Sequence, residues 1–501
     1  MQGPFIGAEV IPAVSPEARS LKRSTGPAGL IVLRPRHNPL GGEADQGRRG
    51  TWDRTNVPVD PLIRKTDLTR ALSPAPLFTA EGTGNPVGCG TCTPPDPNGA
   101  AGPNHYVQVV NSTEVAIYNK SGILVTGPFN LNSLWAGVTG KCDASTSGDP
   151  VVVYDGLADR WLLAQFFEAD QNGICVAVSQ TSDPAGAYYL YQFSTVDFPD
   201  YFKFAVWPDG YYMSDNETTY AAYAFERAKM LRGKGAKFQW FTGQTNLLLP
   251  ANLDGKARPL AGTPEHFYTF KDDIFHGGTD RLEVYDFHVN WLNLSGSTFT
   301  LANSIDISPF TYTVCGYFHF SCIKQKNTTR RIDALSEWPM FRFPYRHFGT
   351  YEALAGTFTV GGGLGGSGAA VRWFELHNSG TGWSLFQEGT VDPGDGNDRF
   401  VASIAMDRQD NLALGYSVSS SNLFPSIRYA VHRVGDAAGT MRKEAKLIDG
   451  GGSQTGSNRW GDYSAMTVDP ADNLTFWYTS EYYPVTAGTA WKTRIGALRA
   501  H

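Results

Sequence analysis

The sequence predicts an all-β protein, and within that class a seven-bladed β-propeller with an extended N-terminal arm; six or eight blades also fit the pattern. Gly (55) and Pro (30) are frequent among the 501 residues, and only 18% are charged. This balance favours short strands joined by tight turns over long charged helices. Aromatic residues make up 13% of the chain, and they suit pleated surfaces. The third observation is a recurring hairpin.

In this hairpin an apolar strand ends in Asp, a short polar turn follows, and a second strand is rich in apolar and aromatic residues. It occurs at 153–166, 405–416 and 467–478, in shortened form at 206–213, and its beginning recurs at 102–110. An Asp followed by Gly, Pro or Asp-Asn caps a β-turn through its side chain. The copies lie several tens of residues apart, which is about the length of a four-stranded antiparallel blade.

Counting these hairpins and the segments between them yields seven units. They lie near 96–130, 148–194, 201–250, 256–310, 330–388, 397–448 and 458–500. The fourth and fifth show no clear Asp turn, so the count is seven, give or take one. Seven units in a ring form a β-propeller. The rival fold is an array of two-sheet sandwiches. Pairing of 491–498 with an N-terminal strand would seal the ring and satisfy both exposed edges.

The chain divides into a Pro- and Arg-rich N-terminal arm or propeptide, 1–85, and the propeller, 86–501. The first segment has few periodic apolar residues, and GLIVLRPR at 29–36 is its only good strand candidate. Acidic residues are interspersed among its basic ones, which makes a polyanion-binding arm the weaker interpretation.

Composition excludes some functional classes. Apolar residues make up 41% of the chain, which is enough for a sizeable core. The net charge of -6 means that the chain has no overall excess of basic residues with which to bind nucleic acid. No apolar run approaches the roughly 20 residues that cross a bilayer, so no membrane span is expected. No signal peptide is visible, which indicates either a cytosolic protein or a processed secreted one.

The cysteines favour the second option. They form three close pairs: Cys89/Cys92, Cys142/Cys175 and Cys315/Cys322. An even number in loop-like contexts indicates disulfides and an oxidising compartment, although other connectivities remain open. The pair in GCGTC could instead be a redox CxxC or half a metal site, but a loop signal follows it and no second CxxC completes a zinc cage. We therefore expect a secreted or cell-surface protein.

Three segments carry a resemblance to a known group. RWGDYSAMTVDPADNLTFWYTSEY, VASIAMDRQDNLALGYSVSS and AVRWFEL resemble bacterial secreted β-propeller proteins, grouped loosely with sialidase-like or Asp-box propellers. The resemblance covers about 96–500 and implies a propeller fold and secretion, but no single activity. The sialidase Asp-box, Ser-x-Asp-x-Gly-x-x-Trp, is absent, and 154–161 is only a relative of it. Family histidines near Tyr351 and further on are also missing, which puts any role they carry in doubt.

In a propeller the loops that enter the innermost strands converge on one mouth of the central channel. Polar residues at these positions include Asp96, His105, Tyr201 and His266. The predicted catalytic residues are Arg346, His347, Tyr351, Glu352, Asp149 and Asp462. The predicted substrate-binding residues are Arg459, Tyr463, Arg399, Lys203 and Arg258. This mixture of acidic, basic and aromatic groups suits a sugar or a carboxylated polymer.

Each candidate has a purely structural alternative. Asp149 and Asp462 can bond backbone N–H groups in turns, and Arg399 and Arg459 can pair with an Asp of the neighbouring blade. Large aromatics such as Trp460 fill the space between sheets.

Three enzyme mechanisms can use these residues. An exo-sialidase clamps a carboxylate with three Arg and uses a Tyr/Glu nucleophilic pair. Those roles fit Arg346, Arg399 and Arg459 with Tyr351 and Glu352.

A polysaccharide lyase neutralises a uronate with a cation and moves a proton, for which Arg346, His347 and Tyr351 suffice. A retaining or inverting hydrolase needs two carboxylates, for which Asp149 and Asp462 are candidates.

No cofactor is required by any of these mechanisms, but a structural Ca²⁺ is a further prediction. Asp392, Asp395 and Asp398 lie in one Asp-rich turn whose oxygen atoms suit this ion. The turn is not an EF-hand because it lacks the closing Glu. HExxH, Walker A and GxSxG motifs are absent.

The first functional hypothesis is a secreted carbohydrate-active enzyme, a glycoside hydrolase or polysaccharide lyase that acts on acidic glycans at the channel mouth. The alternatives are a non-catalytic glycan- or protein-binding adhesion propeller, and a structural subunit of a surface assembly that contacts other surface proteins. The fold alone does not separate them, because propellers host all three roles.

Overall fold

The computed structural model describes residues 1–24, 59–63, 71–85, 92–111, 113–145, 148–168, 171–315, 321–363 and 368–501. Within these residues the chain is all-β. Its α-helices are single turns, α1 (Arg227–Met230) and α2 (Asp273–His276), and short 3-10 turns lie at Ala18–Ser20, Leu131–Trp135 and Leu294–Gly296. No helix in the described part of the chain has the length and apolar character needed to cross a membrane.

Seven groups of four antiparallel strands, called units 1 to 7 below, account for most of the described residues. Unit 1 consists of β4 (Asn98–Ala101), β5 (His105–Val110), β6 (Glu114–Asn119) and β7 (Leu124–Asn130). Unit 2 consists of β8 (Val151–Asp155), β9 (Arg160–Phe167), β10 (Gly173–Ser179) and β11 (Tyr188–Ser194). Unit 3 consists of β12 (Asp200–Val206), β13 (Tyr211–Asn216), β14 (Tyr220–Phe225) and β15 (Phe238–Gln244). Unit 4 consists of β16 (Leu249–Leu253), β17 (Glu265–Lys271), β18 (Arg281–His288) and β19 (Thr298–Asp306).

The remaining units follow in chain order, except for one strand. Unit 5 consists of β22 (Phe343–His347), β23 (Glu352–Gly361), β24 (Ala369–Asn378) and β25 (Ser384–Val391). Unit 6 consists of β26 (Asp398–Met406), β27 (Leu412–Ser419), β28 (Ser426–His432) and β29 (Ala445–Ile448). Unit 7 consists of β30 (Ala465–Val468), β31 (Thr475–Tyr482), β32 (Lys492–Arg499) and β3 (Phe78–Gly84). Between units 4 and 5 lies a short hairpin of β20 (Ser321–Ile323) and β21 (Ile332–Asp333).

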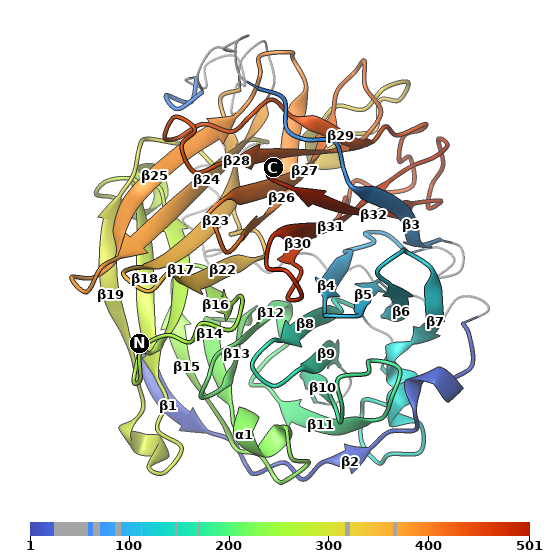
Figure 1. The fold of residues 1–501 in the computed structure, drawn as a ribbon, viewed down its shortest axis with the longest axis vertical. Helices are drawn as coiled ribbons and strands as arrows, with labels where there is room; N and C mark the ends of the chain where they lie inside the picture. The colour runs from blue at the N-terminus through green and yellow to red at the C-terminus, as the bar shows by residue number, and fades with distance from the viewer. Residues whose placement is uncertain are drawn as a thin grey trace.

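The units are arranged radially. The first strands β4, β8, β12, β16, β22, β26 and β30 contact one another in this order, and β30 contacts β4. Figure 1 shows these strands around the centre of the molecule with the other strands of each unit outside them. The order closes on itself, which is not the arrangement of a sandwich array. At one junction the contact is a parallel pairing, because Ala251 and Phe343 are register partners between β16 and β22.

Side chains bond the units to one another along the axis. Val152 N donates to Asn98 Oδ1 (3.3 Å), and Val206 N donates to Asn252 Oδ1 (3.2 Å). Met466 N donates to Ser403 Oγ (2.9 Å), and Ala101 N donates to Thr467 Oγ1 (3.3 Å). The inward edge of a first strand has no further strand beside it, so these side chains satisfy backbone groups that would otherwise be buried without a partner.

The ring closes through the pairing that the sequence predicts. Phe78 to Gly84 of β3 pair antiparallel with β32, whose Ala497 is the register partner of Phe78. This confirms that an N-terminal strand completes the last unit. β3 precedes the predicted boundary at residue 85, so the end of the N-terminal segment is itself a strand of the ring.

The other described parts of the N-terminal arm lie along the outside of the ring. β1 (Gln2–Ile6) pairs with β15 and β2 (Ala13–Val14) pairs with β11, which adds a fifth strand to units 3 and 2. The carboxylate of buried Asp60 meets Arg372 of unit 5 at 2.6 Å. Figure 1 shows the two N-terminal strands following the rim of the molecule. The strand candidate at 29–36 lies outside the described residues.

The Asp turns form as predicted. Asp155 Oδ1 accepts from Leu157 N (3.1 Å), and Asp407 Oδ1 accepts from Gln409 N (2.7 Å). Asp469 Oδ1 likewise accepts from Ala471 N (3.0 Å). Large aromatics fill the space between sheets, and both Trp161 and Trp460 are 1% exposed. The structural interpretation of these tryptophans is therefore confirmed.

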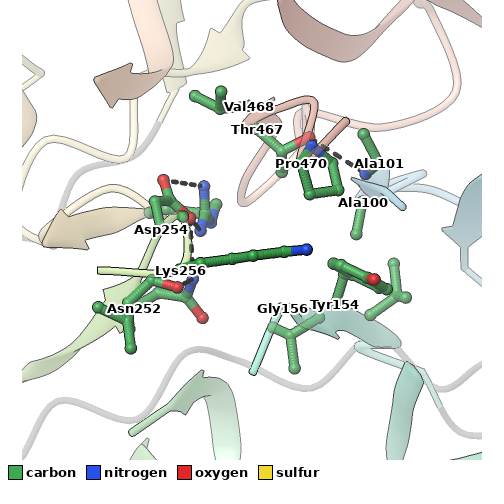
Figure 2. Close-up of a pocket in the computed structure, with 15 residues that line it drawn as sticks. Ala100, Ala101, Tyr154, Gly156, Asn252, Asp254, Lys256, Thr467, Val468 and Pro470 are labelled. Atoms are coloured by element: carbon green, nitrogen blue, oxygen red, sulfur yellow. Dashed lines mark hydrogen bonds and ion pairs between the residues drawn. The ribbon is translucent and has the colours of Figure 1, made fainter. Parts of the chain in front are cut away.

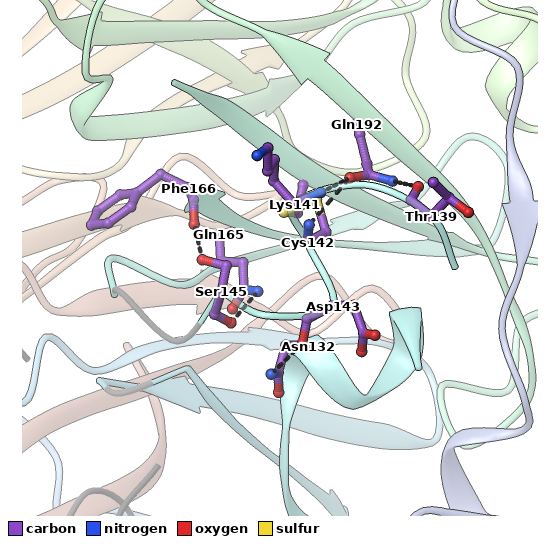
Figure 3. The surroundings of a disulfide bond; sticks show 10 residues. Asn132, Thr139, Lys141, Cys142, Asp143, Ser145, Gln165, Phe166 and Gln192 are labelled. Atoms are coloured by element: carbon purple, nitrogen blue, oxygen red, sulfur yellow. Dashed lines mark hydrogen bonds between the residues drawn. A yellow bond between two sulfur atoms is a disulfide. The ribbon is translucent and has the colours of Figure 1, made fainter. Parts of the chain in front are cut away.

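Two of the predicted pairs lie wholly within the described residues, and both are disulfides, Cys142–Cys175 and Cys315–Cys322. Figure 3 shows the first one, where Gln192 Oε1 accepts from Lys141 N (2.8 Å) and Cys142 N (3.1 Å) and so fixes the loop that holds the bond. Cys92 is also disulfide-bonded, and its predicted partner Cys89 lies outside the described residues. Structural disulfides are typical of proteins that fold in an oxidising compartment.

Replacement of Gln108 tests the closure of the ring. This buried side chain of unit 1 accepts from Thr83 N (2.8 Å) and donates to Thr479 Oγ1 (2.7 Å) and Thr493 Oγ1 (3.0 Å), all in unit 7. We expect Gln108→Leu to lower the free energy of unfolding by about 1–3 kcal/mol, because it leaves buried polar groups unsatisfied. Urea denaturation measures the change. Gln409→Ala on an exposed turn is the control, and equal midpoints for both variants would contradict the closure role.

Candidate functional site

The first strands define two faces of the molecule. The segments that precede them lie at what we call the start face, and the Asp turns that follow them lie at the turn face. The sequence analysis placed all predicted catalytic and substrate-binding residues at one mouth. The structure divides them between the two faces and the body of unit 6.

Five predicted residues gather at the start face. Asp149 precedes β8, Arg459, Asp462 and Tyr463 precede β30, and Lys203 lies in the first half of β12. Their side chains contact one another or share partners, so this part of the predicted convergence is present. We call this set the start-face cluster.

Hydrogen bonds hold the acidic side of the cluster. Arg459 Nη2 donates to Asp462 Oδ2, and Arg459 Nε lies 3.6 Å from Asp333 Oδ2. Asp462 N donates to Asp96 Oδ1 at 2.6 Å. Asn111 connects the two neighbouring segments, because its Nδ2 donates to Asp96 while its Oδ1 accepts from Asp149 N (2.9 Å).

Lys203 occupies the cationic side. Its ammonium donates to the carbonyl oxygens of Tyr201 (3.1 Å) and Phe202 (3.0 Å). It also lies over the rings of Tyr201, 3.6 Å from the centroid, and Tyr463, 4.0 Å from the centroid. Cation–π contacts of this kind stabilise a desolvated ammonium.

Burial shifts the ionisation of these groups. Desolvation raises the pKa of Asp149 to about 7 against the pull of Lys203, and it lowers the pKa of Lys203 to about 8. Burial and the charges of Asp462 and Asp149 raise the pKa of Asp96 well above its ordinary value. Burial alone would lower the pKa of Arg459, but the charges of Asp462, Asp333 and Asp96 hold it above its ordinary value.

The connection between β19 and β22 covers this cluster. Tyr201 OH donates to Pro339 O (3.1 Å), and the Trp338 ring packs edge-on against Tyr201 at 4.6 Å. Asp333 of β21 reaches Arg459, as described above. Asp149, Asp462 and Lys203 are therefore only 8%, 4% and 0% exposed. The cluster is a buried charge network under a covering segment rather than an open mouth.

The four predicted residues of unit 5 lie away from this cluster. Arg346 Nε donates to Met406 O (2.7 Å), the last residue of β26, and Nη2 donates to Asn473 Oδ1 (3.3 Å) in the turn after β30. Arg346 and half-buried His347 therefore lie at the turn face. Tyr351 OH donates to Asp410 Oδ2 (2.7 Å), and buried Glu352 accepts from Tyr345 OH.

The prediction of one shared mouth was thus wrong for unit 5, and the reason is structural. The sequence analysis treated these residues as the approach to an inner strand, but Phe343–His347 is itself the innermost strand, paired in parallel with β16. His105 and His266 were likewise expected just before innermost strands. They lie one strand further out, on the second strands β5 and β17. Arg258 is exposed in the loop after β16.

The predicted residues of unit 6 form a local ion-pair network. Arg399 is fully buried and bonds Asp395 through Nη2 (2.9 Å) and Glu444 through Nε (2.9 Å). Asp392 Oδ1 accepts from Gly394 N (2.7 Å), and Asp398 Oδ1 accepts from Ala369 N (2.9 Å). These carboxylates already have donors on the protein, and calcium binding by them stays a prediction.

At the turn face a pocket opens between the first strands. Its empty volume is about 470 Å³, including open solvent, and it is lined by residues of β4, β8, β16 and β30, the turns that follow them, and Arg342. Arg342 Nη2 meets Asp254 Oδ1 at 2.6 Å and Nη1 meets Asp254 Oδ2 at 3.2 Å, a bidentate pair. Figure 2 shows the Lys256 side chain extended across the pocket toward Tyr154 and Ala100.

The charge of the pocket follows from these contacts. Asp254, Lys256 and Arg342 are its only charged lining residues. Because Asp254 and Arg342 neutralise each other, the exposed ammonium of Lys256 leaves the lining with one net positive charge. Tyr154 OH, by contrast, is engaged with Asp159 Oδ1 at 2.5 Å. The pocket can attract an anion and offers an aromatic wall.

Sequence reasoning missed this pocket because it looked before the first strands rather than after them. The signal was nevertheless present in LPANLDGKA, where Asp254-Gly255 is a strong turn dipeptide directly after a short apolar run. Unit 4 therefore has the Asp turn that the sequence analysis did not assign to it. Lys256 is the next residue after this dipeptide.

No protein-family model and no curated protein matches the chain. Among solved structures, an α-L-arabinofuranosidase from Fusarium graminearum is 10% identical, with 70% of this chain and 93% of that chain covered and a TM-score of 0.35. The polysaccharide lyase Uly1 is 9% identical, with 83% and 91% covered and a TM-score of 0.38. The WD40 domain of SCAP from fission yeast is 10% identical, with 80% and 81% covered and a TM-score of 0.34. Similarities at this level carry no argument about the site.

The buried carboxyl of Asp149 should make stability depend on pH. The folded protein keeps a proton on Asp149 up to about pH 7, whereas the unfolded chain releases it near the ordinary value of 3.8. Raising the pH between these values therefore lowers the free energy of unfolding through this group. Asp149→Asn removes this titration, and Asn tolerates the positive φ of 49° at this position.

We expect Asp149→Asn to gain about 2 kcal/mol or more over the wild type between roughly pH 4.5 and pH 8. Urea denaturation at both pH values measures the gain, and Asp143→Asn on an exposed loop is the control. A constant difference between wild type and Asp149→Asn would show that Asp149 is ionised throughout.

Proposed function

We propose that this protein is a secreted seven-bladed β-propeller that binds an acidic glycan, without chemical conversion, in the turn-face pocket. The cyclic order of seven first strands and the closing β3–β32 pair support the blade number. The disulfides support folding in an oxidising compartment. No cofactor is required for this function.

The ammonium of Lys256 carries the proposal, because none of the described residues forms an ion pair or a hydrogen bond with it. It extends over an axial pocket whose one lining carboxylate is already held by Arg342. A carboxylate on a sugar would pair with this ammonium, and a pyranose face would pack on the apolar and aromatic lining around Tyr154. Axial pockets with few convergent polar groups are common ligand sites.

Binding is favoured over catalysis by the chemistry of the lining. A hydrolase needs two carboxylates at a defined separation, and Asp254 is the only one that lines the pocket. The predicted hydrolase carboxylates Asp149 and Asp462 lie instead at the start face, under the segment that contains Trp338 and Pro339. An enzyme that used them would have to displace this segment.

Strand donation to a neighbouring subunit is less well supported. β1, β2 and β3 each pair with a strand of their own ring. The described strands of the arm are therefore already used inside the chain, and a role in a surface assembly would require another contact.

Substitution of Lys256 tests the function. We expect Lys256→Gln to weaken binding of polygalacturonate oligomers about 10-fold or more, because a charge-assisted hydrogen bond is lost. Calorimetry against polygalacturonate, sialyllactose and neutral lactose measures affinity and charge preference. Lys237→Gln on the exposed rim of unit 3 is the matched control and should bind as the wild type does.

The same ligands separate the alternatives. New reducing ends or an unsaturated uronate product would overturn the non-catalytic function in favour of a hydrolase or a lyase. Equal binding by wild type and Lys256→Gln would place the glycan elsewhere. Preference for an acidic peptide over every glycan would indicate a protein partner instead.

A further inference from the structure

A second group of side chains lies at the turn face between units 5 and 6, outside the pocket. Glu375 and His377 are two residues apart on β24, so their side chains point to the same face of the sheet. Asp410 lies in the Asp turn that joins β26 to β27. One ligand atom from each of the three residues lies within 4.8 Å of the others. The function proposed above does not use this group.

We propose that Glu375, His377 and Asp410 bind a divalent first-row transition metal ion, with Zn²⁺ and Mn²⁺ as the best fits. In the described part of the chain this is the only group of three such side chains with metal-binding geometry. His377 Nε2 lies 2.5 Å from Glu375 Oε1 and 3.8 Å from Asp410 Oδ2. One imidazole and two carboxylates therefore converge on one point.

A buried carboxylate oxygen of Asp410 points independently to a ligand. Asp410 is 9% exposed, and none of the described residues donates a hydrogen bond to its buried Oδ1. A carboxylate oxygen of Glu375 lies within 4.8 Å of one of Asp410, so the two acidic groups are close together. Two buried carboxylates in this arrangement repel each other unless a cation or a proton lies between them.

Neighbouring side chains hold the three groups in place. Gln387 Nε2 donates to Glu375 Oε2 (2.7 Å), and Tyr351 OH donates to Asp410 Oδ2 (2.7 Å). The His377 ring stacks on Phe386 with centroids 3.9 Å apart and packs on Tyr351 at 4.5 Å. Hydrogen bonds and packing of this kind orient metal ligands in known sites. Tyr351, a catalytic candidate of the sequence analysis, acts here as a positioning residue.

The donor set selects the type of metal. Ca²⁺ and Mg²⁺ prefer oxygen ligands alone, whereas an imidazole nitrogen suits Zn²⁺ and its first-row neighbours. Three protein ligands leave at least one coordination position for water. The side chains of His377 and Asp410 are 17% and 11% exposed, so an ion can reach the group from solvent.

Metal titration of the full chain tests the proposal. EDTA-treated protein without an affinity tag is titrated with Zn²⁺ or Mn²⁺ by calorimetry, with Ca²⁺ for comparison. We expect one equivalent of Zn²⁺ or Mn²⁺ to bind and to raise Tm, because the ion binds the folded state only. Co²⁺ should show the visible absorption of a nitrogen- and oxygen-ligated ion.

Variants locate the bound metal. His377→Ala and Asp410→Asn should each weaken binding by about 100-fold or more and abolish the rise in Tm, whereas Gln387→Ala should weaken it by roughly 10–100-fold. His347→Gln, a half-buried histidine on the same face, is the matched control and should bind as the wild type does. If His377→Ala does not fold, Asp410→Asn and Glu375→Gln, which keep the side-chain volume, carry the test.

Two results would overturn the proposal. The first is the absence of one-equivalent binding by any of the transition metals. The second is equal affinity in wild type, Asp410→Asn and Glu375→Gln, which would show that the bound metal lies elsewhere in the protein. Neither result depends on glycan binding, so the metal site and the glycan pocket can fail separately.

Discussion

The unpaired inner edge of each first strand is the constraint on which the rest of the structure depends. A four-stranded unit leaves backbone groups open on the side that faces the axis, where no further strand follows. Asn98, Asn252, Ser403 and Thr467 meet this need by accepting N–H groups from a neighbouring unit. At the junction of units 4 and 5 the parallel β16–β22 pairing does so. Short polar side chains at the axis are therefore structural before they are functional.

This constraint also separates the two faces chemically. At the start face the covering segment buries a dense set of charges, and their pairing holds the segments of units 1, 2, 3 and 7 together. Because removing charges from water costs free energy, such a network contributes more to a unique geometry than to the stability of the fold. At the turn face a pocket remains between the first strands and the turns that follow them, and Lys256 lines it.

The parts of the fold with a local physical signal could be predicted from the sequence. The Asp turns at 155, 407 and 469 have side-chain caps that act within a few residues, and the two described disulfides connect cysteines that lie close in the chain. The position of β22 had no such signal. Its partner β16 lies about ninety residues earlier, and parallel pairing leaves no turn between the strands.

That single displaced strand explains most of the errors at the site. With β22 assigned correctly, Arg346 and Tyr351 fall at the turn face and Asp149 and Asp462 at the start face. Lys256 is found in the pocket because it follows the end of a first strand. Glu375 and His377 lie together because they share one face of a strand, and Asp410 joins them from a turn. Those relations become visible only when the strand bounds are known.

Closure of the ring by β3 and β32 has a consequence for synthesis of the chain. Arg494 Nη2 of β32 meets Thr79 Oγ1 of β3 across 415 residues of sequence. At a ribosomal rate of 5–20 residues per second, roughly 20 to 80 s separate the emergence of the two strands. During this interval β3 has no partner of its own, and its hydrogen-bonding edge is available to chaperones or to other nascent chains. Successful biogenesis therefore requires that this early strand be shielded until the last one arrives.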